Sequence, residues 1–106
     1  MMRKNGFVAM GLAGLLAACT YVQSQPGAEK VVLFQPGQIT RCTQLGSVKV
    51  SVLDRVGFVA RSSGKVESEL QALARNSAVD MGGDTITAAG PVSEGKQTFN
   101  IYRCLR

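Results

Sequence analysis

Three cysteines are the side chains of this 106-residue chain that are best suited to chemistry. They stand at Cys19, Cys42 and Cys104. A thiolate can act as a nucleophile, bind a metal or form a disulfide. The three positions match no zinc-ligand spacing, and the sequence contains no histidine, the usual proton-transfer group near neutral pH. We therefore expect no metal, no cofactor and no enzymatic activity.

Two further groups of polar residues resemble reactive sites only superficially. Asp80 and Asp84 flank Gly82-Gly83, and paired carboxylates can do acid-base work or bind Ca²⁺. No EF-hand spacing accompanies them, so we interpret them as the end of a helix and the start of a strand. Ser62 has no histidine or lysine placed to activate it, and we interpret it as part of a loop.

The first eighteen residues have the order of a secretory signal peptide. Arg3 and Lys4 form a basic start, and an apolar run extends from Phe7 to Ala18. This run is shorter than the roughly 20 residues that a spanning helix needs. We predict that residues 1–18 are a signal peptide, and the alternative is a short buried helix.

The end of this segment defines the chemistry expected of its cysteine. Leu16-Ala17-Ala18-Cys19 resembles the lipobox of bacterial lipoproteins. The resemblance implies a diacylglyceryl group on the Cys19 sulfur, cleavage between Ala18 and Cys19, and acylation of the new amine by a chain such as palmitate. Several acyl chains anchor a protein stably. Thr20 stands where an Asp would favour the inner membrane, so we expect the periplasmic face of the outer membrane. An ordinary signal peptide with an incidental cysteine is the alternative.

The chain after Cys19 divides into a tether and a domain. Residues 19–30 are mostly polar and contain Pro26-Gly27, which predicts a tether, and residues 31–106 form the expected periplasmic domain. If Cys19 carries lipid, Cys42 and Cys104 are left in an oxidising compartment, where we expect them to form a disulfide. Two buried free thiols are the alternative.

Hydrophobic periodicity predicts a β-β-α-β-β order. The expected elements are strands at 29–34 and 42–52, a helix at 65–81, and strands at 84–90 and 97–104. The fold class is α+β, with one helix on one face of a small, mostly antiparallel sheet stapled by the disulfide. Gly82-Gly83 should end the helix, and Ser63 or Gly64 should cap its start. Residues 54–64 are ambiguous, because their apolar patch could pack loosely or extend a strand.

The charge pattern argues against nucleic-acid binding. The formal net charge is +5, and without Arg3 and Lys4 the remaining 10 basic and 7 acidic residues leave +3. The basic residues are scattered, with no stripe interleaved with aromatic residues.

Several short motifs resemble one family. "CTQLGSV", "ELQALARNSAVDMGGDTI" and the terminal "YRC" resemble small bacterial lipoproteins classed as a domain of unknown function. More distantly, they are similar to the lipoprotein sensor of the Rcs envelope-stress pathway. The resemblance implies the fold, the lipid anchor and the compartment, but no active site. We expect a non-enzymatic envelope component that binds a protein, peptidoglycan or lipopolysaccharide; the alternative is an envelope-stress signalling lipoprotein. The oligomeric state stays open.

Overall fold

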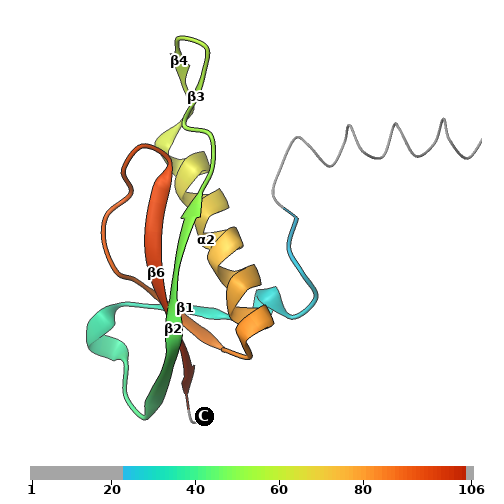
Figure 1. Ribbon diagram of the computed structural model, residues 1–106, viewed down its shortest axis with the longest axis vertical. Helices are drawn as coiled ribbons and strands as arrows, with labels where there is room; N and C mark the ends of the chain where they lie inside the picture. The colour runs from blue at the N-terminus through green and yellow to red at the C-terminus, as the bar shows by residue number, and fades with distance from the viewer. Residues whose placement is uncertain (1–22, 105–106) are drawn as a thin grey trace, which may run out of the picture.

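The computed structural model describes residues 23–104, which form one sheet, one long helix and a small hairpin (Figure 1). The elements in order are η1 Ala28–Lys30, β1 Val32–Phe34, η2 Pro36–Gln38, β2 Cys42–Ser51, β3 Arg55–Val56, β4 Val59–Ala60, α2 Ser63–Met81, β5 Thr85–Ala88 and β6 Lys96–Cys104. The main sheet has the strand order β1-β5-β6-β2, and β3 and β4 pair only with each other.

The longest strand pair of the sheet is β2–β6. The two strands run antiparallel from Cys42 opposite Cys104 to Ser51 opposite Lys96. Their register shifts between Gln44 and Gly46, which marks a β-bulge at the glycine. The predicted alternation of this strand is confirmed: Val50 is buried, whereas its polar neighbours are exposed.

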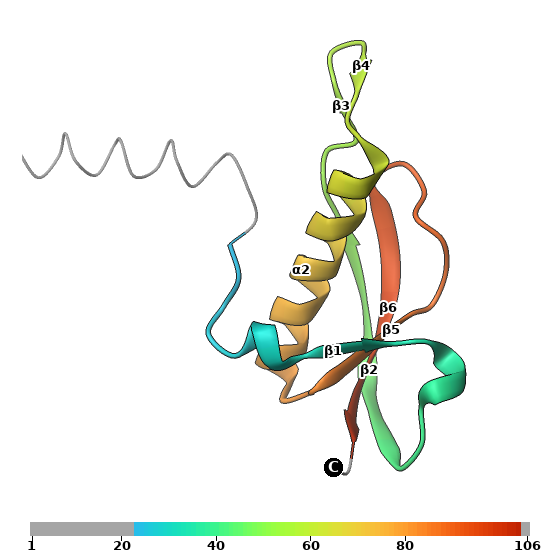
Figure 2. The same cartoon turned by 180° about the vertical axis from the view of Figure 1, so that it is seen from behind.

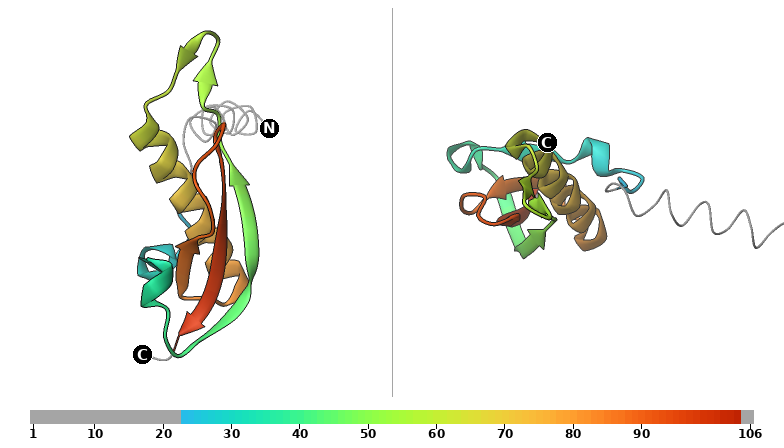
Figure 3. Two further views of the ribbon diagram at one scale, coloured as in Figure 1. Left: turned by 90° about the vertical axis from the view of Figure 1, so that its left-hand side faces the viewer. Right: turned by 90° about the horizontal axis from the view of Figure 1, so that it is seen from above.

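Helix α2 covers one face of the sheet (Figures 1 and 3). The 19-residue helix buries one apolar stripe, which is formed by Val66, Leu70, Ala74 and Ala78. These side chains pack against Ile86 of β5 and against Phe99 and Ile101 of β6. The spacing of the stripe is that of one helix face, so the predicted amphipathic helix and the α+β class are confirmed.

Both ends of α2 follow from local sequence. Ser62 is the N-cap, and its Oγ accepts a hydrogen bond from the Lys65 amide at 3.3 Å. The prediction of Ser63 or Gly64 as the cap was therefore wrong by one or two residues. At the other end Gly82 has φ +78°, and the amides of Gly82 and Gly83 donate to the carbonyls of Val79 and Ala78. This Schellman arrangement confirms the predicted glycine stop.

The expected hairpin of the last two strands is present, since β5 and β6 pair antiparallel. The first strand is shorter than predicted and lies parallel to β5, with Val32 opposite Thr85. This parallel edge strand completes a mostly antiparallel sheet.

The segment before β1 lies against the lower half of α2 in Figure 2. The Gln25 amide donates to Asn76 Oδ1 at 2.8 Å, and Asn76 Nδ2 donates to the Gln23 carbonyl at 2.7 Å. Ala28 in η1 is buried. The sequence predicts a tether through residue 30, whereas these contacts attach residues 23–30 to the folded domain.

Cys42 and Cys104 form a disulfide with an S–S distance of 2.00 Å. They face each other at the end of the β2–β6 ladder, as expected from strands that lie side by side. The bond joins the first residue of β2 to the last residue of β6, so it crosslinks one end of this strand pair.

The predicted signal peptide, the cleavage position at Ala18 and the lipidation position at Cys19 lie outside the described residues. Between residues 23 and 104, no helix combines the length and the apolarity needed to cross a membrane.

Candidate functional site

The β3–β4 hairpin projects beyond the end of the sheet at which α2 begins (Figures 1 and 3). Arg55 pairs with Ala60 and Val56 with Val59. The turn between them is Gly57-Phe58, and Gly57 has φ +63°. A glycine with positive φ in the first position of a two-residue loop is typical of a type II′ turn, whose twist matches that of the strands. The turn therefore places Phe58 at the tip.

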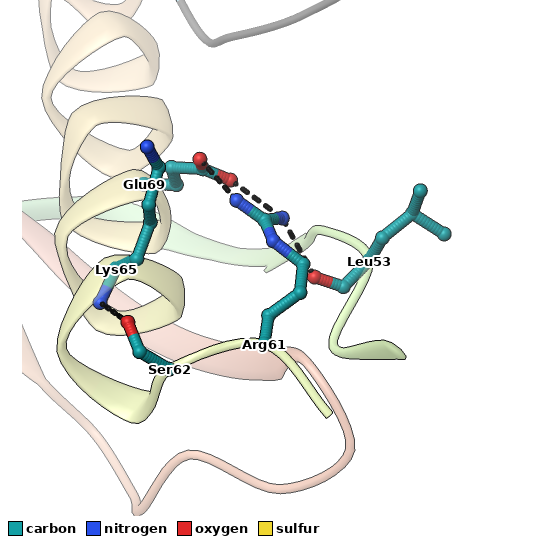
Figure 4. A network of polar contacts seen from close by, with 5 residues as sticks. All are labelled: Leu53, Arg61, Ser62, Lys65 and Glu69. Atoms are coloured by element: carbon teal, nitrogen blue, oxygen red, sulfur yellow. Dashed lines mark hydrogen bonds and ion pairs between the residues drawn. The ribbon is translucent and has the colours of Figure 1, made fainter. Parts of the chain in front are cut away.

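Arg61 attaches the base of this hairpin to α2 (Figure 4). Its guanidinium donates to both carboxylate oxygens of Glu69, at 3.1 and 2.6 Å, and Nη1 also donates to the Leu53 carbonyl at 2.8 Å. The Arg61 amide donates to the Asp54 carbonyl at 2.8 Å. A planar guanidinium suits such a two-pronged contact. These bonds connect both ends of the hairpin to the second turn of the helix.

The same contact shifts the ionisation of both partners. The hydrogen bond from Arg61 lowers the pKa of Glu69 below its ordinary value, against the opposing effect of burial. The hydrogen bond to Glu69 raises the pKa of Arg61. Because the pKa of Glu69 is depressed in the folded state, the contact stabilises the fold above the unfolded pKa of a glutamate, about 4.3. That stabilisation is lost as the pH falls through the folded pKa.

The hairpin exposes apolar side chains that the rest of the described chain does not cover. Phe58 is fully exposed, and Leu53, Val56 and Val59 are 69%, 65% and 70% exposed. Isolated exposed apolar residues are normal on protein surfaces, but a contiguous apolar patch marks an interaction site. We call Val56, Phe58 and Val59 the hairpin tip. The sequence left two alternatives open for residues 54–64, loose packing of the apolar patch or extension of a strand. The structure shows neither, because β3 and β4 form a separate hairpin whose apolar side chains are exposed.

A cleft of about 240 Å³ lies at the base of the hairpin. Its apolar lining comes from Ala60 of β4, from Val66 of α2, and from Val92 in the β5–β6 connection. Its charged lining consists of the carboxylates of Asp54, Glu67 and Glu94 and of the guanidinium groups of Arg55 and Arg61. We call this cavity the base cleft. Between residues 23 and 104 the only ion pair is Arg61–Glu69, so the three cleft carboxylates carry no salt bridge there.

The β5–β6 connection shapes one wall of the base cleft. Glu94 and Gly95 have φ +51° and +72°, and the Ser93 and Lys96 main chains exchange hydrogen bonds of 2.9 Å across them. Two successive positive φ values define a type I′ turn. Asparagine is the usual residue in the first position, and a glutamate there is conformationally costly. The turn holds the Glu94 side chain at the edge of the cleft.

A second, more open cleft of about 560 Å³ lies between the same connection and β2. Lys49 and Lys96 contribute its positive charge, and Glu94 contributes a carboxylate. Large exposed apolar side chains gather on the hairpin rather than around this cleft. The hairpin tip together with the base cleft is therefore the better candidate for a functional site.

The residues that the sequence presents as reactive have structural roles. Asp84 Oδ1 accepts hydrogen bonds from the Cys104 amide at 3.0 Å and from Thr85 Oγ1 at 2.9 Å. Asp80 accepts one from Gln25 at 3.3 Å, and Ser62 caps α2. In the described part of the chain, no group of three or more His, Cys, Asp or Glu side chains is placed to hold a metal ion.

Sequence reasoning did not identify the hairpin as a site. A local signal was available in "VGFV" at residues 56–59, where a glycine precedes Phe58 between two valines. Glycine in the first position of a two-residue loop between β-branched residues favours a hairpin. Periodicity alone does not reveal that β3 and β4 pair only with each other, because any further neighbour would come from elsewhere in the chain.

These features define a small α+β domain with a disulfide at one end and an exposed apolar hairpin at the other. The chain belongs to the family described as a domain of unknown function, DUF4156, whose profile matches residues 22–104. A search of curated proteins found no match. A search of solved structures found none either. The resemblance to a domain-of-unknown-function family is thus confirmed, and the match includes residues 23–30 that dock onto α2.

Proposed function

We propose that this protein is a lipid-anchored, non-enzymatic component of the bacterial envelope that binds a protein partner through its hairpin tip. In this proposal Cys19 carries the lipid, residues 1–18 are removed, and the domain faces the periplasm from the outer membrane. The observation that carries the binding role is a fully exposed Phe58 beside two exposed valines on a hairpin fastened to the helix.

The attachment of the hairpin to α2 supports a role in binding. A flexible apolar loop loses conformational entropy when it is ordered by a partner, and a preorganised one loses less. Arg61 already ties the hairpin to Glu69 and to the Leu53 carbonyl. Aromatic side chains, phenylalanine among them, are enriched in protein–protein interfaces.

The position of the hairpin also suits an anchored protein. Asn76, which holds the N-terminal segment, lies 13 residues after Ser63 on α2, so the two positions are about 20 Å apart along the helix axis. Four residues of extended chain between Cys19 and Gln23 span at most about 14 Å. The anchor therefore joins the domain toward one end, and the hairpin projects from the other.

The structural roles of the polar candidate residues support the non-enzymatic part of the proposal. Asp84 and Ser62 hold main-chain groups at the ends of secondary-structure elements. Peptidoglycan and lipopolysaccharide are less suited to the hairpin tip, because sugars and phosphates require polar donors and acceptors, which apolar side chains lack.

Site-specific crosslinking in living cells tests the binding role. A photoreactive phenylalanine analogue replaces Phe58 in the full chain, and the same analogue at exposed Thr43, beside the disulfide, is the control. We expect a discrete protein adduct from position 58 and none from position 43. Equal labelling from both positions, or no protein adduct from position 58, would contradict the proposal.

A second experiment tests the anchor. Replacing Cys19 with serine should leave an unprocessed precursor that takes up no labelled fatty acid. A Cys19→Ser chain that matures and still carries lipid would refute the proposed anchor, whatever the hairpin binds.

We also propose a narrower version, suggested by the resemblance of the short sequence motifs to the Rcs sensor, in which the bound partner belongs to an envelope-stress pathway. Deleting the gene should then change the output of that pathway under envelope stress. An unchanged output would remove the signalling version and leave the binding role intact.

A further inference from the structure

The cleft between the β5–β6 connection and β2 differs in chemistry from the hairpin, and we call it the sheet cleft. Its volume of about 560 Å³ is in the range of small-molecule sites. The connection that forms one wall bows away from β6 in Figure 1. The charged residues of the lining are Lys49, Lys96 and Glu94, and two hydroxyl-bearing residues, Ser93 and Thr98, line it as well.

The two lysines of the sheet cleft lie close together on one face of the sheet. Lys49 is opposite Thr98 in the β2–β6 ladder, and Lys96 is opposite Ser51, so the lysines are diagonal neighbours. Such neighbours are about 7–8 Å apart between Cα atoms. Val50, which follows Lys49, belongs to the buried core under α2. Because side chains alternate along a strand, the lysines point to the opposite face of the sheet.

Neither lysine is neutralised in the described part of the chain. Lys49 and Lys96 are both exposed, and the only ion pair there is Arg61–Glu69. Two like charges at this spacing repel each other. An anionic group placed between them removes the repulsion and accepts a charge-assisted hydrogen bond from each ammonium.

The wall of the sheet cleft is fixed and offers acceptors. Gln97 Nε2 donates to the Gly90 carbonyl at 3.0 Å, and the Ala89 amide donates to the Thr98 carbonyl at 2.8 Å. Gln97 Oε1 is buried and has no hydrogen-bond partner among residues 23–104. A buried acceptor without a donor is costly, so a bound hydroxyl or water that donates to it would be favourable. The Glu94 carboxylate is a second acceptor.

We propose that the sheet cleft binds a sugar that carries an anionic group, either a carboxylate or a phosphate. The anionic group lies between the ammonium groups of Lys49 and Lys96, and a neighbouring sugar hydroxyl donates to Glu94. A bare anion fits less well, because Glu94 repels it and it has no hydroxyl to donate. The hairpin tip takes no part in this site, so the inference does not depend on the partner of the hairpin.

Titration of the purified full chain in detergent tests this site, with amide NMR shifts at Lys49 and Thr98 as the readout. The probes are two matched pairs. N-Acetylmuramic acid is N-acetylglucosamine with an added carboxylate, and glucose 1-phosphate is glucose with an added phosphate. We expect at least one acidic sugar to give saturable shifts and its neutral counterpart to bind at least tenfold more weakly.

The outcome of the titration also identifies the source of the anionic group. Saturation by N-acetylmuramic acid supports a carboxylate sugar such as that of peptidoglycan, and saturation by glucose 1-phosphate supports a phosphorylated sugar. Saturation by neither would overturn the proposal. Acetate or inorganic phosphate that binds as tightly as the acidic sugars would overturn it as well, because the site would then recognise only charge.

Paired charge removal tests the role of the lysines. Lys49→Gln with Lys96→Gln should weaken binding of the acidic sugar about tenfold or more. The control, Lys30→Gln with Lys65→Gln, removes the same charge at exposed positions that do not line the sheet cleft, and it should change binding less than twofold. Unchanged thermal unfolding of both variants is the folding control. Equal losses in the two variants would overturn the assignment of the site to Lys49 and Lys96.

Discussion

Removing the Cys42–Cys104 disulfide should cost this domain a large part of its stability. The bond joins residues 62 positions apart in the sequence, which face each other at one end of the β2–β6 ladder. In the chain-entropy model a loop of this length removes about 14 cal/mol/K from the unfolded state, which corresponds to about 4 kcal/mol at 25 °C. A domain of this size has a total stability of about 4–12 kcal/mol.

The perturbation is the double variant Cys42→Ser, Cys104→Ser, compared with the native chain in urea unfolding. We expect the free energy of unfolding to fall by about 4 kcal/mol and the melting temperature to fall by roughly 15–30 °C. The m value should rise, because an unfolded chain without the crosslink exposes more surface. Thr43→Ser, at the neighbouring ladder position, is the matched control and should leave all three quantities nearly unchanged.

Reduction of the native chain by a thiol reductant provides an independent comparison, because it removes the same crosslink without a substitution. Both routes should give the same loss. A loss below about 1 kcal/mol by both routes would refute the reasoning. It would mean that the reduced, unfolded chain already keeps the ends of β2 and β6 close together.

Three further predictions concern the packing of α2. Leu70→Ala removes a fully buried side chain at the centre of the core and should lower the free energy of unfolding by about 2–5 kcal/mol in urea titration; a loss below 1 kcal/mol would contradict the assigned core. Glu69→Gln should speed proteolytic cleavage after Arg61 at neutral pH. The native chain should show the same acceleration only when the pH falls through the pKa of Glu69, which the contact with Arg61 holds below the ordinary value of a glutamate; pH-independent cleavage of the native chain would count against the ion pair. Asn76→Ala removes two hydrogen bonds to the N-terminal segment and should increase amide hydrogen exchange at Gln25, with a stability loss of about 1–3 kcal/mol; unchanged exchange would show that other contacts hold this segment.

Much of the fold could be predicted from local sequence. The apolar spacing from Val66 to Met81 predicts one buried helix face, and the glycine pair after it predicts the stop. The alternation in β2 was also accessible, because side-chain direction in a strand alternates regardless of its neighbours. The α+β class follows from these elements.

The candidate site was much less accessible than the fold. The sequence shows that Val56, Phe58 and Val59 are apolar, and an apolar residue is ordinarily expected to be buried. Whether it is buried depends on which element covers it, and for these residues none of the described elements does. The contact between Arg61 and Glu69 likewise depends on how the chain turns between β4 and α2. Hydrophobic periodicity does not predict the direction of that turn.

By itself, the sequence determined the features that depend on near neighbours along the chain: the helix and its glycine end, the strand alternation, and the processing motif that remains an expectation at Cys19. Tertiary structure decided what depends on distant neighbours. It placed β1 parallel to β5, docked residues 23–30 on α2, and left the hairpin tip exposed. The physical reason is that burial and strand pairing are properties of two surfaces, and a local pattern describes only one of them.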